Sequence, residues 1–261
     1  AVKPTRLRRA AYFRSLASQT SSIFQNMSIK NNFVMVGIGS LILLSQAHAS
    51  QSFDIGGIRL GSSAVEAQSA ASAMNSKLTF SELKRREDGK VMGVSGTEAG
   101  AFPKDSVKIF FDEQNATWFV HRSQRYAEGS RPSREGVFVA LKEKFGEPTF
   151  SNTTDLLSGN ASWHFDRSGK IYKGPLGKAP CSGTDSMGRG TPPSTFPEHC
   201  GTFIQATWNF ANKEKMVDEL GVTIHESSRM YDTLKRVQDK SNSAKREALE
   251  AERSKSVKPK I

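Results

Sequence analysis

The chain has few long apolar runs, and this shortage limits the classes of protein it can belong to. Its longest run extends over twelve residues, from Phe33 to Leu44, and is interrupted by Gly37, Gly39 and Ser40. A membrane-spanning helix needs about 20 predominantly apolar residues. No cysteine follows this run closely, and an N-terminal lipid anchor requires one there. The sequence therefore predicts neither a membrane-spanning helix nor a lipid anchor.

Recognisable catalytic motifs are also lacking. We find no H-E-x-x-H, no G-x-S-x-G, no phosphate-binding Gly-Lys loop and no dinucleotide fingerprint. His121 and His164 fall in expected strands, where a solvent-facing position is the simplest interpretation. His225 ends a strand before a helix, which favours a cap or surface role. The sequence thus identifies no catalytic, cofactor-binding or metal-binding residue, and it predicts no cofactor.

Acidic residues are absent from the first 49 positions, which instead resemble an export leader. Lys30 precedes the apolar run, and the small-x-small triplet Ala47-His48-Ala49 follows it. This order is typical of a secretory signal peptide. We interpret 27–49 as that signal and 1–26 as an upstream extension, with translation starting at Met27. The predicted location is the periplasm or the medium, and the compact leader indicates a bacterial envelope.

An excess of basic residues gives a formal net charge of +11, but it lies at the two ends. The segment 50–233 holds 22 basic and 22 acidic residues, whereas 234–261 holds nine basic and four acidic ones. A neutral body argues against nucleic-acid binding. The charged tail is expected to be solvated. The alternative is docking on an anionic surface or on an acidic envelope partner.

Only two cysteines occur, Cys181 and Cys200. In an oxidising compartment they are expected to form a disulfide. The segment between them is rich in Gly, Pro and Ser, so it can bury little core of its own. A cross-link over such a loop is worth about 3 kcal/mol on the chain-entropy model. A metal site with His199 is the alternative, but two cysteines without a finger-like His pair make a poor zinc signature.

Apolar patterning predicts an α+β fold with antiparallel sheet, two helices packed on one face and a C-terminal helix. The expected helices cover about 63–74, 131–146 and a segment that starts at Ser227 or Ser228. Beyond Val237 the apolar pattern ends, which indicates a frayed helix or a disordered tail. The expected strands are 53–60 with a bulge at Gly56-Gly57, 77–86, 90–95, 107–111, 117–122, 161–166, 170–173, 202–210 and 216–224.

These elements predict one secreted domain, 50–233, followed by a charged helical or disordered tail, 234–261. The succession of a helix and antiparallel strands occurs twice. One interpretation is therefore that the domain consists of two similar halves, 50–130 and 131–233.

Three tryptophans fall in expected strands: Trp118, Trp163 and Trp208. Core packing is the simpler interpretation of all three. The functional alternative is an exposed aromatic platform, which with His121 and His164 defines a candidate binding surface.

Two short windows carry a family resemblance. Short segments of the chain resemble segments of uncharacterised secreted bacterial proteins. They are I-R-L-G-S-S-A-V-E-A at 58–67 and V-A-L-K-E-K-F-G-E-P-T at 139–149, with W-H-F at 163–165. They are also similar to small outer-membrane assembly lipoproteins and β-lactamase-inhibitor-like modules. The resemblance implies helices on an antiparallel sheet and a protein-binding role. We therefore expect a non-catalytic binding or envelope-associated module, with an exported hydrolase as the alternative.

Overall fold

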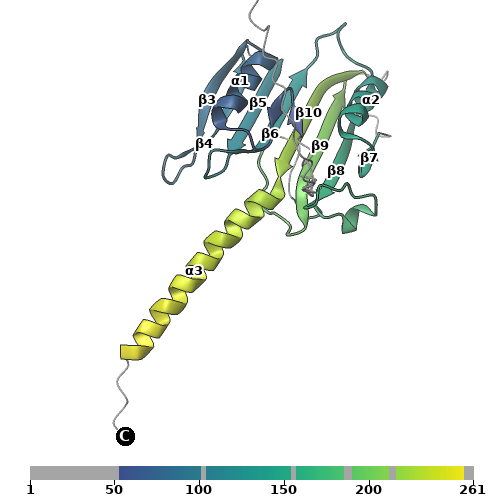
Figure 1. The fold of residues 1–261 in the computed structure, drawn as a ribbon. Helices are drawn as coiled ribbons and strands as arrows, with labels where there is room; N and C mark the ends of the chain where they lie inside the picture. The colour runs from purple at the N-terminus through teal and green to yellow at the C-terminus, as the bar shows by residue number, and fades with distance from the viewer. Residues whose placement is uncertain (1–52, 101–103, 154–156, 185–189, 212–215, 256–261) are drawn as a thin grey trace, which may run out of the picture. The chain divides into compact units, whose positions relative to one another are not determined.

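A computed structural model describes residues 53–100, 104–153, 157–184, 190–211 and 216–255 of the chain. Its centre is an eight-stranded antiparallel sheet of order β3-β4-β5-β6-β10-β9-β8-β7 (Figure 1). The helices and strands are β1 Asp54–Ile55, β2 Ile58–Arg59, α1 Ala64–Met74, β3 Leu78–Lys84, β4 Val91–Glu98, β5 Asp105–Phe111, β6 Thr117–Arg125, α2 Arg134–Phe145, β7 Phe150–Asn152, β8 Ser158–Asp166, η1 Leu176–Lys178, β9 Cys200–Phe210, β10 Val217–Glu226 and α3 Ser227–Lys255. The expected α+β class, antiparallel sheet and C-terminal helix are confirmed.

The sheet contains the same succession of elements twice. α1 precedes the antiparallel meander β3-β4-β5-β6, and α2 precedes the meander β7-β8-β9-β10. The last strands of the two meanders, β6 and β10, pair with each other over seven residue pairs from Glu219↔Arg125 to His225↔Phe119. The β6–β10 pair therefore joins two segments that are each continuous in the chain.

The starts of α1 and α2 are built alike. Ser63 caps α1 by accepting from the backbone N–H of Glu66, and Ser133 caps α2 by accepting from that of Gly136. Side-chain oxygens at this position satisfy backbone donors that the helix leaves unpaired. Each capping serine also forms an isolated bridge to the residue just before the last strand of its half, Ala116 or Met216. The caps thus fix where each helix starts relative to its sheet.

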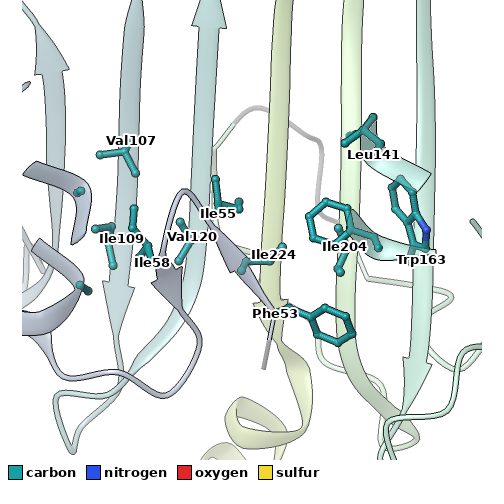
Figure 2. Packing of buried hydrophobic residues seen from close by; sticks show 14 of the residues in the cluster. Phe53, Ile55, Ile58, Val107, Ile109, Val120, Leu141, Trp163, Ile204 and Ile224 are labelled. Carbon is teal, nitrogen blue, oxygen red and sulfur yellow. The ribbon is translucent and has the colours of Figure 1, made fainter. Parts of the chain in front are cut away.

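One apolar cluster joins both helices, the β1–β2 hairpin and one side of the large sheet (Figure 2). Antiparallel partners point to the same side of a sheet, and the row Ile109↔Val120↔Ile224↔Ile204↔Trp163 crosses five strands. Helix residues of this cluster are Ala67 and Ala71 of α1 and Val137, Leu141 and Phe145 of α2. We call this side of the sheet the core face.

Two local expectations are wrong, and one short strand was not predicted. Residues 53–60 form the two-residue strands β1 and β2 around a turn, rather than one strand with a bulge; Gly56 and Gly57 have φ of 59° and 87°, which glycine adopts without steric cost. The segment 170–173 contributes only the isolated bridge Phe165↔Ile171. β7 was not predicted, because its three residues show little apolar pattern.

The C-terminal helix starts at Ser227, as expected, and continues to Lys255. Ion pairs hold its first turns: Arg229 bonds to Asp112 of the β5–β6 turn, and Asp232 bonds to Arg167 after β8. Residues 238–255 are exposed except for the half-buried Ser243. None of the helices in the described segments is long and apolar enough to cross a membrane. The predicted signal peptide, 27–49, and the extension, 1–26, lie outside the described residues.

Candidate functional site

The side of the sheet opposite the core face is polar and aromatic, and we call it the polar face. Cross-strand partners define three neighbouring rows on it. The aromatic row is Phe110↔Phe119↔His225↔Phe203↔His164. The middle row is Lys108↔His121↔Thr223↔Gln205↔Ser162. The hydroxyl row is Ser106↔Ser123↔Gly221↔Thr207↔Asn160. The face therefore changes from apolar to hydrogen-bonding across these three rows.

The loop closed by the disulfide packs on this face. Cys181 and Cys200 are bonded, with their Cα atoms 4.6 Å apart, which confirms the predicted pair. A Cβ added at Gly190 would lie 2.5 Å from His121 Cδ2, so the backbone there lies directly against the imidazole. The Phe196 ring packs edge-on against Trp118, with centroids 5.7 Å apart. The described parts of the loop thus cover the apolar end of the polar face.

The histidines of the polar face are buried beneath this cover. His121, His164 and His225 retain 6 %, 4 % and 0 % of their exposure, so the expected solvent-facing or surface positions are wrong. The sheet register places them on the side opposite the core face, but that side is itself covered.

Each imidazole is held by a hydroxyl. His121 Nδ1 is 2.8 Å from Thr223 Oγ1, His164 Nε2 is 3.2 Å from Ser162 Oγ, and His225 Nδ1 is 3.1 Å from Ser227 Oγ. Burial, together with the smaller effect of the charge on Lys108, lowers the pKa of His121 to about 4. Burial likewise lowers the pKa of His164 to about 4. At neutral pH both rings are therefore uncharged hydrogen-bonding groups.

A hollow of about 520 Å³ lies over the hydroxyl row, and we call it the central hollow. Residues that line it include Lys108, His121, Ser123, Asn160, Thr207 and Glu219. Ser123 donates a hydrogen bond of 3.1 Å to Glu219, which also lies 3.6 Å from Arg125. The central hollow thus offers mostly neutral hydroxyl and amide groups, with one cation and one carboxylate among them.

A second hollow, of about 420 Å³, adjoins the first at Asn160 and extends toward the disulfide. Ser162, His164, Phe203, Gln205 and Cys181 are among the residues that line it. Within the described segments, three atoms of its lining residues are buried without a hydrogen-bond partner: His164 Nδ1, Thr184 Oγ1 and Gln205 Oε1. A buried polar group left unpaired costs roughly 1–3 kcal/mol. A ligand that supplies a donor and an acceptor here would recover that cost.

The described segments contain no group of three or more His, Cys, Asp or Glu side chains able to hold a metal ion. The three tryptophans are buried, at 6 % exposure for Trp118, 0 % for Trp163 and 1 % for Trp208, so an exposed aromatic platform is wrong. Trp163 and Trp208 belong to the core cluster, and Trp118 to the cluster around Phe110. The five residues of the candidate binding surface therefore lie on both sides of the sheet.

Sequence reasoning missed Ser162, Gln205 and Thr223 as members of one site. Alternation in β9 assigns Ile204, Ala206 and Trp208 to the core face, and the same alternation assigns Gln205 to the other side. That signal was present, but the pairing of β9 with β8 and β10 was needed to bring the three together.

Comparison with known protein families, with curated proteins and with solved structures finds no match to this chain. The site is therefore interpreted from its own geometry.

Proposed function

We propose that the protein is an exported, non-catalytic binding module that receives a polar loop of a partner protein on its polar face. The observation that carries this proposal is the set of buried, unpartnered atoms in the second hollow, His164 Nδ1, Thr184 Oγ1 and Gln205 Oε1. Native proteins rarely leave such atoms unpaired within a hollow. A protein-binding role is also what the resemblance at 58–67 and 139–149 implies.

The lining of the hollows favours a peptide loop over an apolar small molecule. Small-molecule sites of 300–1,000 Å³ are lined mainly by apolar and aromatic side chains. Here hydroxyl and amide groups such as Ser123, Asn160 and Thr207 dominate the central hollow. Backbone N–H and C=O groups of a turn match such a surface, because each needs one neutral acceptor or donor.

Export is supported by two features. Disulfides persist in oxidising compartments and are rare in reducing ones, and the Cys181–Cys200 bond is formed. The signal-like segment at 27–49 is the second feature. A periplasmic or extracellular location follows as part of the proposal.

The binding proposal is tested by filling the central hollow. Thr207→Tyr places a bulky ring there, whereas Thr79→Tyr on the exposed side of β3 adds the same ring elsewhere. We expect the purified chain and Thr79→Tyr to retain the same protein from an envelope extract of the source cells. Thr207→Tyr should weaken that purified partner's binding at least about 100-fold by calorimetry. Equal retention by both variants would reject this site.

A hydrolase is the second candidate, because Ser162 Oγ lies 3.2 Å from His164 Nε2 within the second hollow. This is the spacing of a nucleophile and its base. It ranks second because no carboxylate in the described segments orients His164 Nδ1. A fluorophosphonate probe should label the chain at Ser162 and spare Ser162→Ala, with Ser123→Ala as the control, if this candidate is right. Absence of labelling in all three chains would reject it.

Docking of the tail 234–261 on an anionic surface stays a prediction. The exposed part of α3 carries both signs, with Asp239, Glu247, Glu250 and Glu252 among its basic residues. A salt-sensitive association with anionic vesicles that disappears on deletion of 238–261 would support it.

A further inference from the structure

The C-terminal part of α3 is a helix without packing in the described part of the chain. At 1.5 Å per residue, the 29 residues of α3 extend about 43 Å, and the exposed stretch 238–255 makes up more than half of it. Helices in water derive most of their stability from packing an apolar face. An apolar face on residues 238–255 would therefore have to pack on a partner from outside the described residues.

α3 carries a regular stripe along one side. Its positions alternate in steps of four and three residues, which is the spacing of a coiled-coil seam. They are Met230, Leu234, Val237, Ser241, Ala244, Ala248 and Ala251. Leu234 and Val237 are 50 % and 56 % exposed. The large residues thus lie near the body and the small residues lie in the distal part.

We propose that two copies of this chain associate through α3 as an antiparallel helix pair. An antiparallel pair centred between Asn242 and Ser243 sets Leu234 against Ala251 of the second copy, and Val237 against Ala248. Each large side chain then faces a small one, which lets the helices approach closely while filling the seam. A parallel pair would instead stack alanine on alanine over the distal half, which buries little area.

Charges beside the seam also select the antiparallel orientation. Lys240 and Glu247 precede seam positions by one residue, and neither forms an ion pair within the described segments. In the antiparallel pair, Lys240 of each copy lies next to Glu247 of the other. In a parallel pair, Lys240 would meet Lys245 and Glu247 would meet Glu252, which are like charges.

The sheet offers a further packing surface for α3 of the second copy. A hollow of about 310 Å³ lies between the first turns of α3 and the hairpins of the sheet. Its lining is mainly apolar and includes Val91, Met92, Phe110, Trp118, Leu234 and Val237. Lys90 and Arg85 also line it. Asp112 and Glu113 line it as well, so the hollow carries charges of both signs, as the distal part of α3 does. The antiparallel arrangement brings that distal part of the second copy to this mainly apolar hollow.

Association is measured by light scattering on the purified chain, with a dimer as the expected species at about 100 µM. Ala248→Glu places a charge in the seam on an exposed turn that the body does not contact, and it should yield monomer. Asn242→Glu adds the same charge outside the seam and should remain dimeric. A monomeric wild type, or a dimer that Ala248→Glu leaves intact, would overturn the proposal.

Orientation is measured by charge exchange. Lys240→Glu should weaken the dimer about tenfold, because two attractive pairs become repulsive. Adding Glu247→Lys to it should restore the affinity. Arg246→Glu makes the same change in charge on the outer side of α3 and should have little effect. Tighter association of Lys240→Glu would indicate a parallel pair and would refute the antiparallel one.

Discussion

Arg229 Nη1 donates a hydrogen bond of 3.0 Å to Asp112 Oδ2, and this contact joins the start of α3 to the β5–β6 turn. The Asp112 side chain is 1 % exposed, and its other oxygen accepts from the backbone N–H groups of Gln114 and Ala116. One carboxylate therefore shapes the turn and anchors the helix.

Removal of this carboxylate should be strongly destabilising. We expect Asp112→Ala to lower the free energy of unfolding by about 3 kcal/mol, because three part-buried hydrogen bonds to a charged group are lost. Arg229→Gln should cost about 1 kcal/mol, since Arg229 remains partly solvated. Urea unfolding measures both, with the exposed Glu113→Gln as the control. Equal effects of Asp112→Ala and Glu113→Gln would contradict the anchoring role.

Loss of the disulfide should release the cover of the polar face. The paired change Cys181→Ser and Cys200→Ser is expected to lower the free energy of unfolding by about 3 kcal/mol. It should also increase hydrogen exchange in β6 and β9 under the loop, more than in β3 at the far edge of the sheet. Guanidinium unfolding and exchange mass spectrometry test these two effects. Uniform exchange across the sheet would argue against a covering role.

Acid should destabilise the fold through its buried histidines. The pKa values of His121 and His164 are lowered to about 4, whereas the unfolded chain has values near 6.5. Between these values the unfolded state binds more protons, so stability is full above about pH 6.5 and falls as the pH drops toward 4.

Urea unfolding at several pH values between 7.5 and 4.5 should show a loss that steepens below pH 6.5 to about 2 kcal/mol per pH unit, because both histidines contribute. His121→Gln and His164→Gln should each flatten this dependence, while His199→Gln, at an exposed position, should leave it unchanged. An unchanged slope in both buried-site variants would exclude the two histidines as its source.

A methyl group at Gly159 should disrupt the core face. A Cβ there would lie 2.2 Å from Trp208 Nε1, which is far closer than atoms pack. Gly159→Ala is therefore expected to displace the indole and cost about 3 kcal/mol. Near-ultraviolet circular dichroism would report the displaced ring, and thermal unfolding the cost. Gly177→Ala is the control, because nothing lies within 4 Å of its Cβ.

Periodicity predicted most strands and both early helices, because these elements bury one side and expose the other. α2 is an example: Val137, Leu141 and Phe145 are buried at the expected spacing. The burial of His121 and His164 was not predictable, because it depends on a Gly- and Pro-rich loop without periodicity that folds over them. For the distal half of α3 the sequence left a helix and a disordered tail as alternatives, because nothing in that half packs on the body.

The sequence also could not predict that the two hollows lie side by side. Asn160, which lines both, is one position in a polar stretch of β8, and only the register with Thr207 places it beside the middle of the sheet. The disulfide, by contrast, was predictable from composition, because a chain with two cysteines offers each of them one possible partner.

The β6–β10 pair has a consequence for how the chain assembles. β3 to β6 can complete their meander from neighbouring sequence alone, whereas β10 belongs to the far end of the body. Until β10 arrives, β6 is an open edge, and open edges readily accept a strand from another molecule. Two chains that meet at this stage could each supply the other's β10, so the middle of the sheet is where an exchange of halves between copies would begin.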